Sequence, residues 1–193
     1  MAPPDATRRT FPYATTLLPT RLSIDPQAWV APTAVLRGEV TLGARTSIWY
    51  QAVVRGDLAP VTIGEDTNIQ DGVILHVEAE GPTVVGSRVT VGHMAIVHAA
   101  TIGDDCIIAM GSRVLSGARV GRHSIVGAGA VVTEGFEVPE RSLVLGVPAR
   151  VVRSVTNDEI ERIERNWSVY VAYANHHRDE ELRRMSGPGE QRR

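Results

Sequence analysis

The feature that most constrains this chain is an aliphatic residue that recurs every six positions. The spacing runs from Ile24 to Val144 and is interrupted at three places: after Val54, after Leu75 and after Val97. An amphipathic helix repeats every 3.6 residues and a strand every two, so neither keeps a period of six. A hexapeptide β-helix does. The twenty positions are all Ile, Leu or Val: Ile24, Val30, Leu36, Leu42, Ile48, Val54, Ile63, Ile69, Leu75, Val85, Val91, Val97, Ile102, Ile108, Val114, Val120, Val126, Val132, Val138 and Val144.

The irregular gaps set the phase of the repeat. Grouped in threes, the positions give coils 24–36, 42–54, 63–75, 85–97, 102–114 and 120–132, and every gap falls after the third position of a coil. We call the stacked first, second and third positions the first, second and third columns. In five of the six coils a glycine follows the first column, which predicts a turn that needs positive φ or a close backbone approach. The expected fold is an all-β solenoid, a triangular prism with three short strands per coil.

A helix is expected after the solenoid. Thr156 followed by Glu159 forms a capping-box pattern, and an apolar stripe at helical spacing follows it. The stripe consists of Ile160, Ile163, Trp167, Tyr170, Val171 and Ala174. It must cover either the prism wall or a neighbouring subunit. We therefore expect a flexible arm at 1–18, the β-helix domain at 19–150, the C-terminal helix at 151–185 and a disordered tail at 186–193.

The register places two histidines together. The residue that follows the third column is, coil by coil, Arg37, Arg55, His76, His98, Leu115 and Thr133. His76 and His98 therefore share one corner of adjacent coils. Because adjacent strands lie about 4.8 Å apart, two imidazoles stacked in this way can converge on one ion.

His93 falls in a different column, which reads Pro32, Tyr50, Asp71, His93, Met110 and Ala128. It cannot easily reach His76 and His98 of its own chain, but a neighbouring prism in a closed trimer can supply it. Three imidazoles with an open fourth position are a ligand set of catalytic zinc. The alternative is that these histidines are solvated surface side chains. His123, His176 and His177 lack such placement and are expected at the surface.

Composition excludes several classes of protein. The net charge of −2 over 193 residues gives no indication of a nucleic-acid partner. No apolar run approaches the roughly 18 residues of a membrane span, so no membrane partner is expected. The single cysteine, Cys106, excludes an internal disulfide and suits a reducing, cytoplasmic compartment. We expect it to be a small structural residue.

Several segments resemble the γ-class carbonic anhydrase family of left-handed parallel β-helix proteins: "VVRGD" (53–57), "TNIQDG" (67–72), "LHVE" (75–78), "VTVGHMAIVHAATIGDD" (89–105) and "LVLGVPARVVR" (143–153). The resemblance implies a homotrimer with a metal site between subunits. His76 and His98 of one chain and His93 of the next would bind Zn²⁺, or Fe²⁺ or Co²⁺. The implied activity is reversible hydration of CO₂ to bicarbonate by a metal-bound hydroxide.

The resemblance also implies roles for other residues. Gln70 would hydrogen-bond the hydroxide, and Tyr170 of the helix would reach the pocket. Arg55 and Asp57 would form an ion pair that bridges subunits. Asp71 shares the column of His93 and would help to hold that interface.

The chain departs from the family in one place. The best-studied type carries a long acidic loop with a glutamate proton shuttle, whereas here the segment is only "VEAEGPT" (77–83). Glu78 and Glu80 are the candidate shuttles. Three alternatives stay open: a hexapeptide acyltransferase, a metal-binding protein without hydratase activity that serves assembly or acts on a CoA thioester, and a purely structural solenoid.

Overall fold

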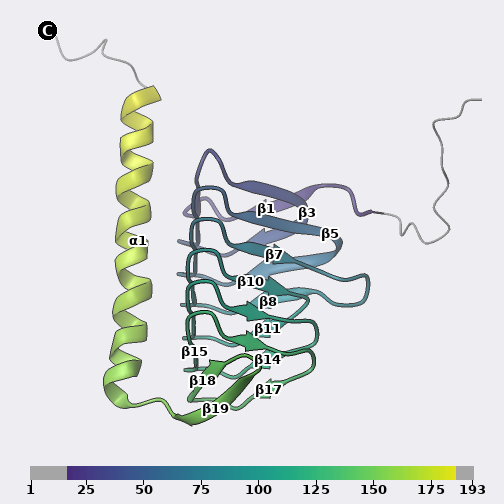
Figure 1. The fold of residues 1–193 in the computed structure, drawn as a ribbon. Helices are drawn as coiled ribbons and strands as arrows, with labels where there is room; N and C mark the ends of the chain where they lie inside the picture. The colour runs from purple at the N-terminus through teal and green to yellow at the C-terminus, as the bar shows by residue number, and fades with distance from the viewer. Residues whose placement is uncertain (1–16, 186–193) are drawn as a thin grey trace, which may run out of the picture.

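The computed structural model describes residues 17–185, and the aliphatic columns form the core of a parallel β-solenoid (Figure 1). The coils stack along one axis, and a single long helix runs beside them (Figure 1). Most of the expected N-terminal arm and all of the expected tail lie outside the described residues. The prediction of an all-β, parallel β-helix with a C-terminal helix is confirmed.

The strands follow the three predicted columns. The first column holds β1 (Arg21–Ile24), the ends of β3 (Val35–Leu42) and β5 (Val53–Ile63), β8 (Thr83–Val85), β11 (Thr101–Ile102), β14 (Arg119–Val120) and β17 (Glu137–Val138). The second holds β2 (Trp29–Val30), β4 (Ser47–Ile48), β6 (Asn68–Ile69), β9 (Thr90–Val91), β12 (Ile107–Ile108), β15 (Ile125–Val126) and β18 (Ser142–Gly146). The third holds the starts of β3 and β5, then β7 (Ile74–His76), β10 (Ile96–His98), β13 (Arg113–Val114) and β16 (Val131–Val132).

The register of these strands matches the predicted register. Leu75 pairs with Val54 on one side and Val97 on the other, as the third column requires. Ile69 likewise pairs with Ile48 and Val91 in the second column. A slip of one residue would turn this aliphatic set outward, so the columns of Ile, Leu and Val hold the register of every polar position between them.

The glycines after the first column serve close approach rather than positive φ. A Cβ on Gly43 would lie 2.7 Å from the backbone nitrogen of Glu65, and one on Gly64 would lie 2.6 Å from the carbonyl carbon of Gly86. Positive φ occurs two residues later, for example at Arg45 and Asp66. At this corner, the close backbone approach falls on the glycine and the positive φ falls on the residue two positions later.

The solenoid ends in an element that the sequence pattern did not predict. Strand β19 (Ala149–Ser154) turns back and pairs antiparallel with β18. Helix α1 (Asn157–Met185) follows, and its predicted capping box is confirmed. Glu159 accepts a hydrogen bond of 2.9 Å from the Thr156 backbone N–H, and the Thr156 hydroxyl accepts one of 3.3 Å from the Glu159 N–H.

Helix α1 covers the second-column wall of its own solenoid. It contacts β2, β4, β6 and β9 as it runs back toward the first coils (Figure 1). Ile163 is fully buried against Ile107 and Ile125, and Ala174 is buried near Trp49. Of the two occupants considered for the apolar stripe, its own prism wall is the one observed.

His177, which was expected at the surface, is only partly exposed. Its Nδ1 lies 2.9 Å from the hydroxyl of Tyr50, and its ring packs against Trp29 and Trp49. These partners lie far away in the sequence, so the column register carried no sign of them. His123 is also largely covered, with its Nε2 3.7 Å from Asp105.

Within residues 17–185, no helix combines the length and apolar character that crossing a bilayer requires.

Candidate metal centre

His76 and His98 end two paired strands of the third column. Strands β7 and β10 align His76 directly with His98, so the predicted stacking is confirmed. Nδ1 of His76 faces Nε2 of His98 at 3.1 Å. Two nitrogens bound to one tetrahedral zinc, each about 2.0–2.1 Å from the ion, lie about 3.3 Å apart. The observed separation is close to what a shared ion needs.

The outer nitrogens of both rings have partners in the same chain. Nε2 of His76 lies 3.3 Å from a carboxylate oxygen of Asp57, and Nδ1 of His98 lies 3.0 Å from the hydroxyl of Ser116. That hydroxyl in turn donates to Glu78 at 2.7 Å. A carboxylate only accepts, and a serine whose proton is already donated also accepts. Both outer nitrogens are therefore donors.

This arrangement leaves a lone pair on each of the facing nitrogens. A neutral imidazole carries one N–H, and in both rings that N–H points outward. Two lone pairs 3.1 Å apart repel each other unless a cation lies between them. The pair is thus chemically matched to a metal ion, with its outer partners in the usual arrangement of a metal-binding histidine.

Burial and charge keep His76 neutral and Asp57 ionised. Burial, then the nearby Arg55 cation, lowers the pKa of His76. Burial opposes ionisation of Asp57, but hydrogen bonds from Arg55 and His76 outweigh it, and the pKa of Asp57 is lowered. Arg55 and Asp57 pair at 2.7 Å within one chain. Their predicted role in bridging subunits remains a prediction.

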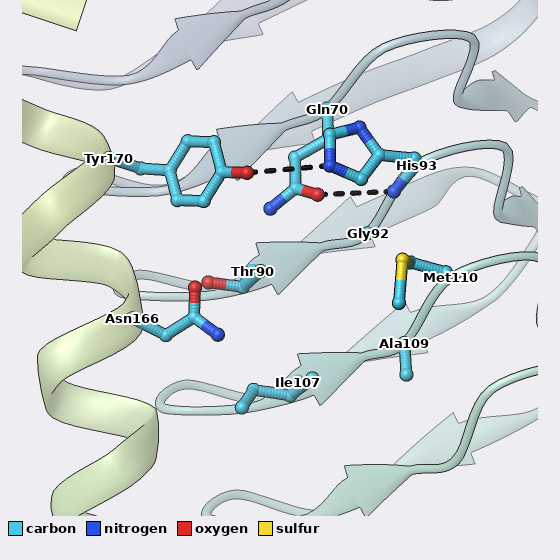
Figure 2. Close-up of a pocket in the computed structure, with 9 residues that line it drawn as sticks. All are labelled: Gln70, Thr90, Gly92, His93, Ile107, Ala109, Met110, Asn166 and Tyr170. Atoms are coloured by element: carbon cyan, nitrogen blue, oxygen red, sulfur yellow. Dashed lines mark hydrogen bonds between the residues drawn. The ribbon is translucent and has the colours of Figure 1, made fainter. Parts of the chain in front are cut away.

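His93 lies on a different corner, where Asp71 fixes the ring proton on Nδ1. Its Nδ1 lies 2.8 Å from the carboxylate of Asp71, so Nδ1 carries the proton. Its Nε2 faces the hydroxyl of Tyr170 at 3.5 Å (Figure 2). Its backbone N–H donates to Oε1 of Gln70 at 3.1 Å. His93 is therefore prepared to offer Nε2 to a ligand.

Gln70 and Tyr170 both contact His93. Nε2 of Gln70 donates to Asn68 at 3.0 Å, which leaves one amide N–H of Gln70 uncommitted. The ring of Tyr170 packs on Trp49. Burial, then the Asp71 carboxylate, raises the pKa of Tyr170, so its hydroxyl stays protonated near neutral pH.

A pocket of ≈ 250 Å³ lies beside His93, between helix α1 and strands β9 and β12 (Figure 2). Asn166 and Tyr170 reach toward it from the helix, one helical turn apart (Figure 2). Ile107, Ala109 and Met110 give it an apolar wall. Such a pocket suits a small, weakly polar molecule held by a few polar groups.

The structure gives two parts of a ligand set rather than one complete set. Within residues 17–185 of one chain, no three His, Cys, Asp or Glu side chains are grouped so that they would hold a metal ion. His76 and His98 form one part, and His93 forms the other. Cys106 is buried, and burial raises its thiol pKa to about 12, in keeping with a structural role.

The sequence pattern missed three residues of the site. Ser116 and Asn68 hold His98 and Gln70 through their side chains, and Asn166 lines the pocket. Asn166 was detectable in principle, because it lies four residues before Tyr170 and therefore on the same helix face. The sequence did not indicate a role for Ser116, because serine is a common residue at the turns of a solenoid.

Comparison with known proteins supports the resemblance to the γ-class carbonic anhydrase family. The family model described as "Bacterial transferase hexapeptide (six repeats)" matches residues 99–134. Gamma carbonic anhydrase 1, mitochondrial, of Arabidopsis thaliana is 37% identical over 84% of this chain, which spans 62% of that protein's length. A carbonic anhydrase of Geobacillus kaustophilus is 39% identical, with 84% of this chain and 90% of that protein covered.

Other similar proteins carry different names. Carnitine operon protein CaiE of Escherichia coli is 42% identical, with 71% of this chain and 70% of that protein covered. A solved hexapeptide transferase family protein from Anaplasma phagocytophilum is 36% identical, with a TM-score of 0.79 and 83% and 97% of the two chains covered. The chain belongs to the γ-class carbonic anhydrase family of hexapeptide-repeat proteins.

Proposed function

We propose that this protein is a metal-dependent hydratase that interconverts CO₂ and bicarbonate at the subunit interfaces of a homotrimer. His76 and His98 of one subunit and His93 of the next would hold Zn²⁺, or Fe²⁺ or Co²⁺. The observation that carries the proposal is the pair of facing ring nitrogens, 3.1 Å apart, whose outer nitrogens are both committed as donors. A cation between the two facing nitrogens would accept both lone pairs.

An exposed apolar strip beside the histidine pair supports the trimer. The third column carries outward-facing aliphatic residues next to the histidines, of which Val35 is 51% exposed and Ile74 is 40% exposed. The strip consists of Val35, Val53, Ile74 and Ile96, and the exposed Arg113 of the next coil ends it. Contiguous exposed aliphatic residues mark an interface. On the other side, Met94 and Met110 flank the His93 corner and are also exposed.

The chain's own residues would prepare the site for the reaction. A bound metal would lower the pKa of water to about 7 and so supply a nucleophile at neutral pH. The uncommitted N–H of Gln70 would orient that nucleophile, and the pocket lined by Ile107 and Ala109 would receive CO₂. Asp57 and Asp71 would keep His76 and His93 in the tautomers that offer a lone pair to the ion.

The test is CO₂ hydration measured by stopped flow on protein loaded with zinc and, separately, with Fe(II) under anaerobic conditions. The proposal predicts a rate above the buffer background that disappears in His98→Ala. A protein that carries stoichiometric metal but shows no rate with either ion would contradict the hydratase assignment while leaving the metal site standing.

A second candidate is a metal-binding relative that acts on a thioester or in assembly, or a hexapeptide acyltransferase. The transferase-named family model and the CaiE relative favour this candidate. It predicts bound metal without CO₂ hydration, or protection by acetyl-CoA in a thermal shift assay. An acetyl-CoA shift, together with no hydration, would select it.

The compartment proposed for the protein is the cytoplasm. The only cysteine is buried and unpaired, which suits a reducing environment.

A further inference from the structure

Ser116 and Glu78 form a hydrogen-bonded chain on the outer side of His98. The Ser116 hydroxyl lies 3.0 Å from Nδ1 of His98 and donates to Oε1 of Glu78 at 2.7 Å. Glu78 comes from a tight hairpin in which it and Gly81 exchange two backbone hydrogen bonds of 3.0 and 3.1 Å. The backbone that carries the carboxylate is therefore held in place.

The serine is required for this connection. His98 Nδ1 and Glu78 Oε1 are 3.8 Å apart, which is too far for a direct hydrogen bond. A carboxylate accepts, so the Ser116 proton points to Glu78 and the serine lone pairs point to His98. Without Glu78, the same hydroxyl would be free to donate to Nδ1, which would move the ring proton to Nε2.

We propose that Ser116 and Glu78 are positioning residues that hold His98 with Nδ1 protonated and Nε2 free for the metal. This inference rests on the proposed metal site and assigns Glu78 a role other than proton shuttle. The two nitrogens of an imidazole lie on opposite sides of the ring, and Glu78 is connected to the side away from His76. Its carboxylate is thus directed at the support of the ligand rather than at the reacting atoms.

The first test measures zinc affinity by competition with a chromophoric chelator. Ser116→Ala should weaken zinc binding by about 10- to 100-fold, the usual effect of removing a partner of a ligating histidine. Ser116→Thr keeps the hydroxyl and should restore the affinity to within about threefold. Ser112→Ala is the matched control, because Ser112 lies in the same coil and donates only to the Ala109 carbonyl.

The second test separates support from proton transfer. Glu78→Ala should weaken zinc binding by about tenfold, and concentrated buffer should not restore turnover at limiting zinc. Glu80→Ala, in the same hairpin, should leave the affinity unchanged. If Glu78→Ala keeps its zinc affinity, loses turnover and recovers it in concentrated buffer, Glu78 is a proton shuttle and the inference is overturned.

The outcomes distinguish this inference from the proposed function. Wild-type protein that binds no stoichiometric zinc, iron or cobalt would overturn both. Wild-type protein that binds zinc with an affinity equal to that of Ser116→Ala would overturn the positioning role alone. Loss of affinity in Ser116→Ala, with recovery in Ser116→Thr and none lost in Ser112→Ala, is the expected result.

Discussion

Two corners of the prism stack polar side chains on successive coils, with different results. At the charged corner, formed by Arg45, Asp66, Arg88 and Asp105, opposite charges meet: Arg45 binds Asp66 through two contacts of 2.6 and 2.7 Å, and Arg88 binds Asp105 at 2.7 Å. At the histidine corner, formed by His76 and His98, two like groups meet at 3.1 Å.

The difference shows how one geometry serves either stability or function. The charged corner satisfies its own groups within the chain, so it needs nothing from outside. The histidine corner satisfies only its outer nitrogens and leaves two facing lone pairs. The coils stack in the same way at both corners. The residue types decide whether a corner stabilises the fold or offers a binding site for an ion.

The largest predicted effect comes from replacing a histidine with an aliphatic residue. Leu115 occupies the same column one coil after His98, so the corner already tolerates leucine. His98→Leu should abolish stoichiometric metal binding and reduce CO₂ hydration to background. The unfolding free energy of the metal-free protein should stay within about 1 kcal/mol or rise, because the lone pair of His76 Nδ1 no longer faces a second lone pair. Urea unfolding and metal analysis measure both, and retained stoichiometric metal would contradict the account.

The reverse is expected at the charged corner. Arg88→Ala should lower the unfolding free energy by about 2 kcal/mol, because it leaves the nearly buried Asp105 without its main partner. Metal content should not change. Arg119→Ala is the control, since Arg119 and Glu137 are exposed and 3.7 Å apart, and it should cost less than about 0.5 kcal/mol. Equal stability of the two variants would remove the contrast between the corners.

A smaller, pH-dependent effect is expected at the start of helix α1. A hydrogen bond from Arg153, followed by one from the Thr156 backbone, lowers the pKa of Glu159 to about 2. A carboxyl with a depressed folded-state pKa stabilises the fold above its unfolded value of 4.5 and loses that contribution as pH falls toward 2. Glu159→Gln should therefore cost about 1 kcal/mol at pH 7 and much less near pH 2. Unfolding curves at the two pH values measure this, and a cost independent of pH would show that charge is not involved.

The smallest effect is expected at the pocket. The Tyr170 hydroxyl lies 3.5 Å from His93 Nε2, at the limit of a hydrogen bond. Tyr170→Phe keeps the packing on Trp49 and should change zinc affinity by less than about threefold. A turnover loss of more than tenfold at unchanged affinity would instead place the hydroxyl in the chemistry.

The sequence predicted the solenoid and the histidine stacking because both follow from one repeat. Once every third-column residue is an aliphatic side chain pointing inward, the next residue must share a corner with its counterparts. The pairing of His76 with His98 therefore follows from counting along the six-residue repeat. The same arithmetic placed His93 and Asp71 in one column, and the structure joins them at 2.8 Å.

The features that the sequence could not predict do not follow from the six-residue repeat. Ser116 reaches His98 from the next coil through the direction of its side chain, which the column does not specify. His177 enters a cluster with Trp29 and Trp49 only because the helix returns along the whole wall. Strand β19 reverses the chain after the repeat has ended, where no periodicity remains to predict it.

The measurement that tests the central claim most directly is metal binding by mixed trimers. His93→Ala keeps the His76 and His98 pair, and His98→Ala keeps His93, so neither variant alone forms a complete shared site. After unfolding and refolding an equal mixture, random assembly of a closed trimer should regenerate about one quarter of the sites. Zinc bound at that level, with CO₂ hydration returning in proportion, is the predicted result. A mixture that binds no more zinc than the separate variants would contradict a site shared between neighbouring subunits.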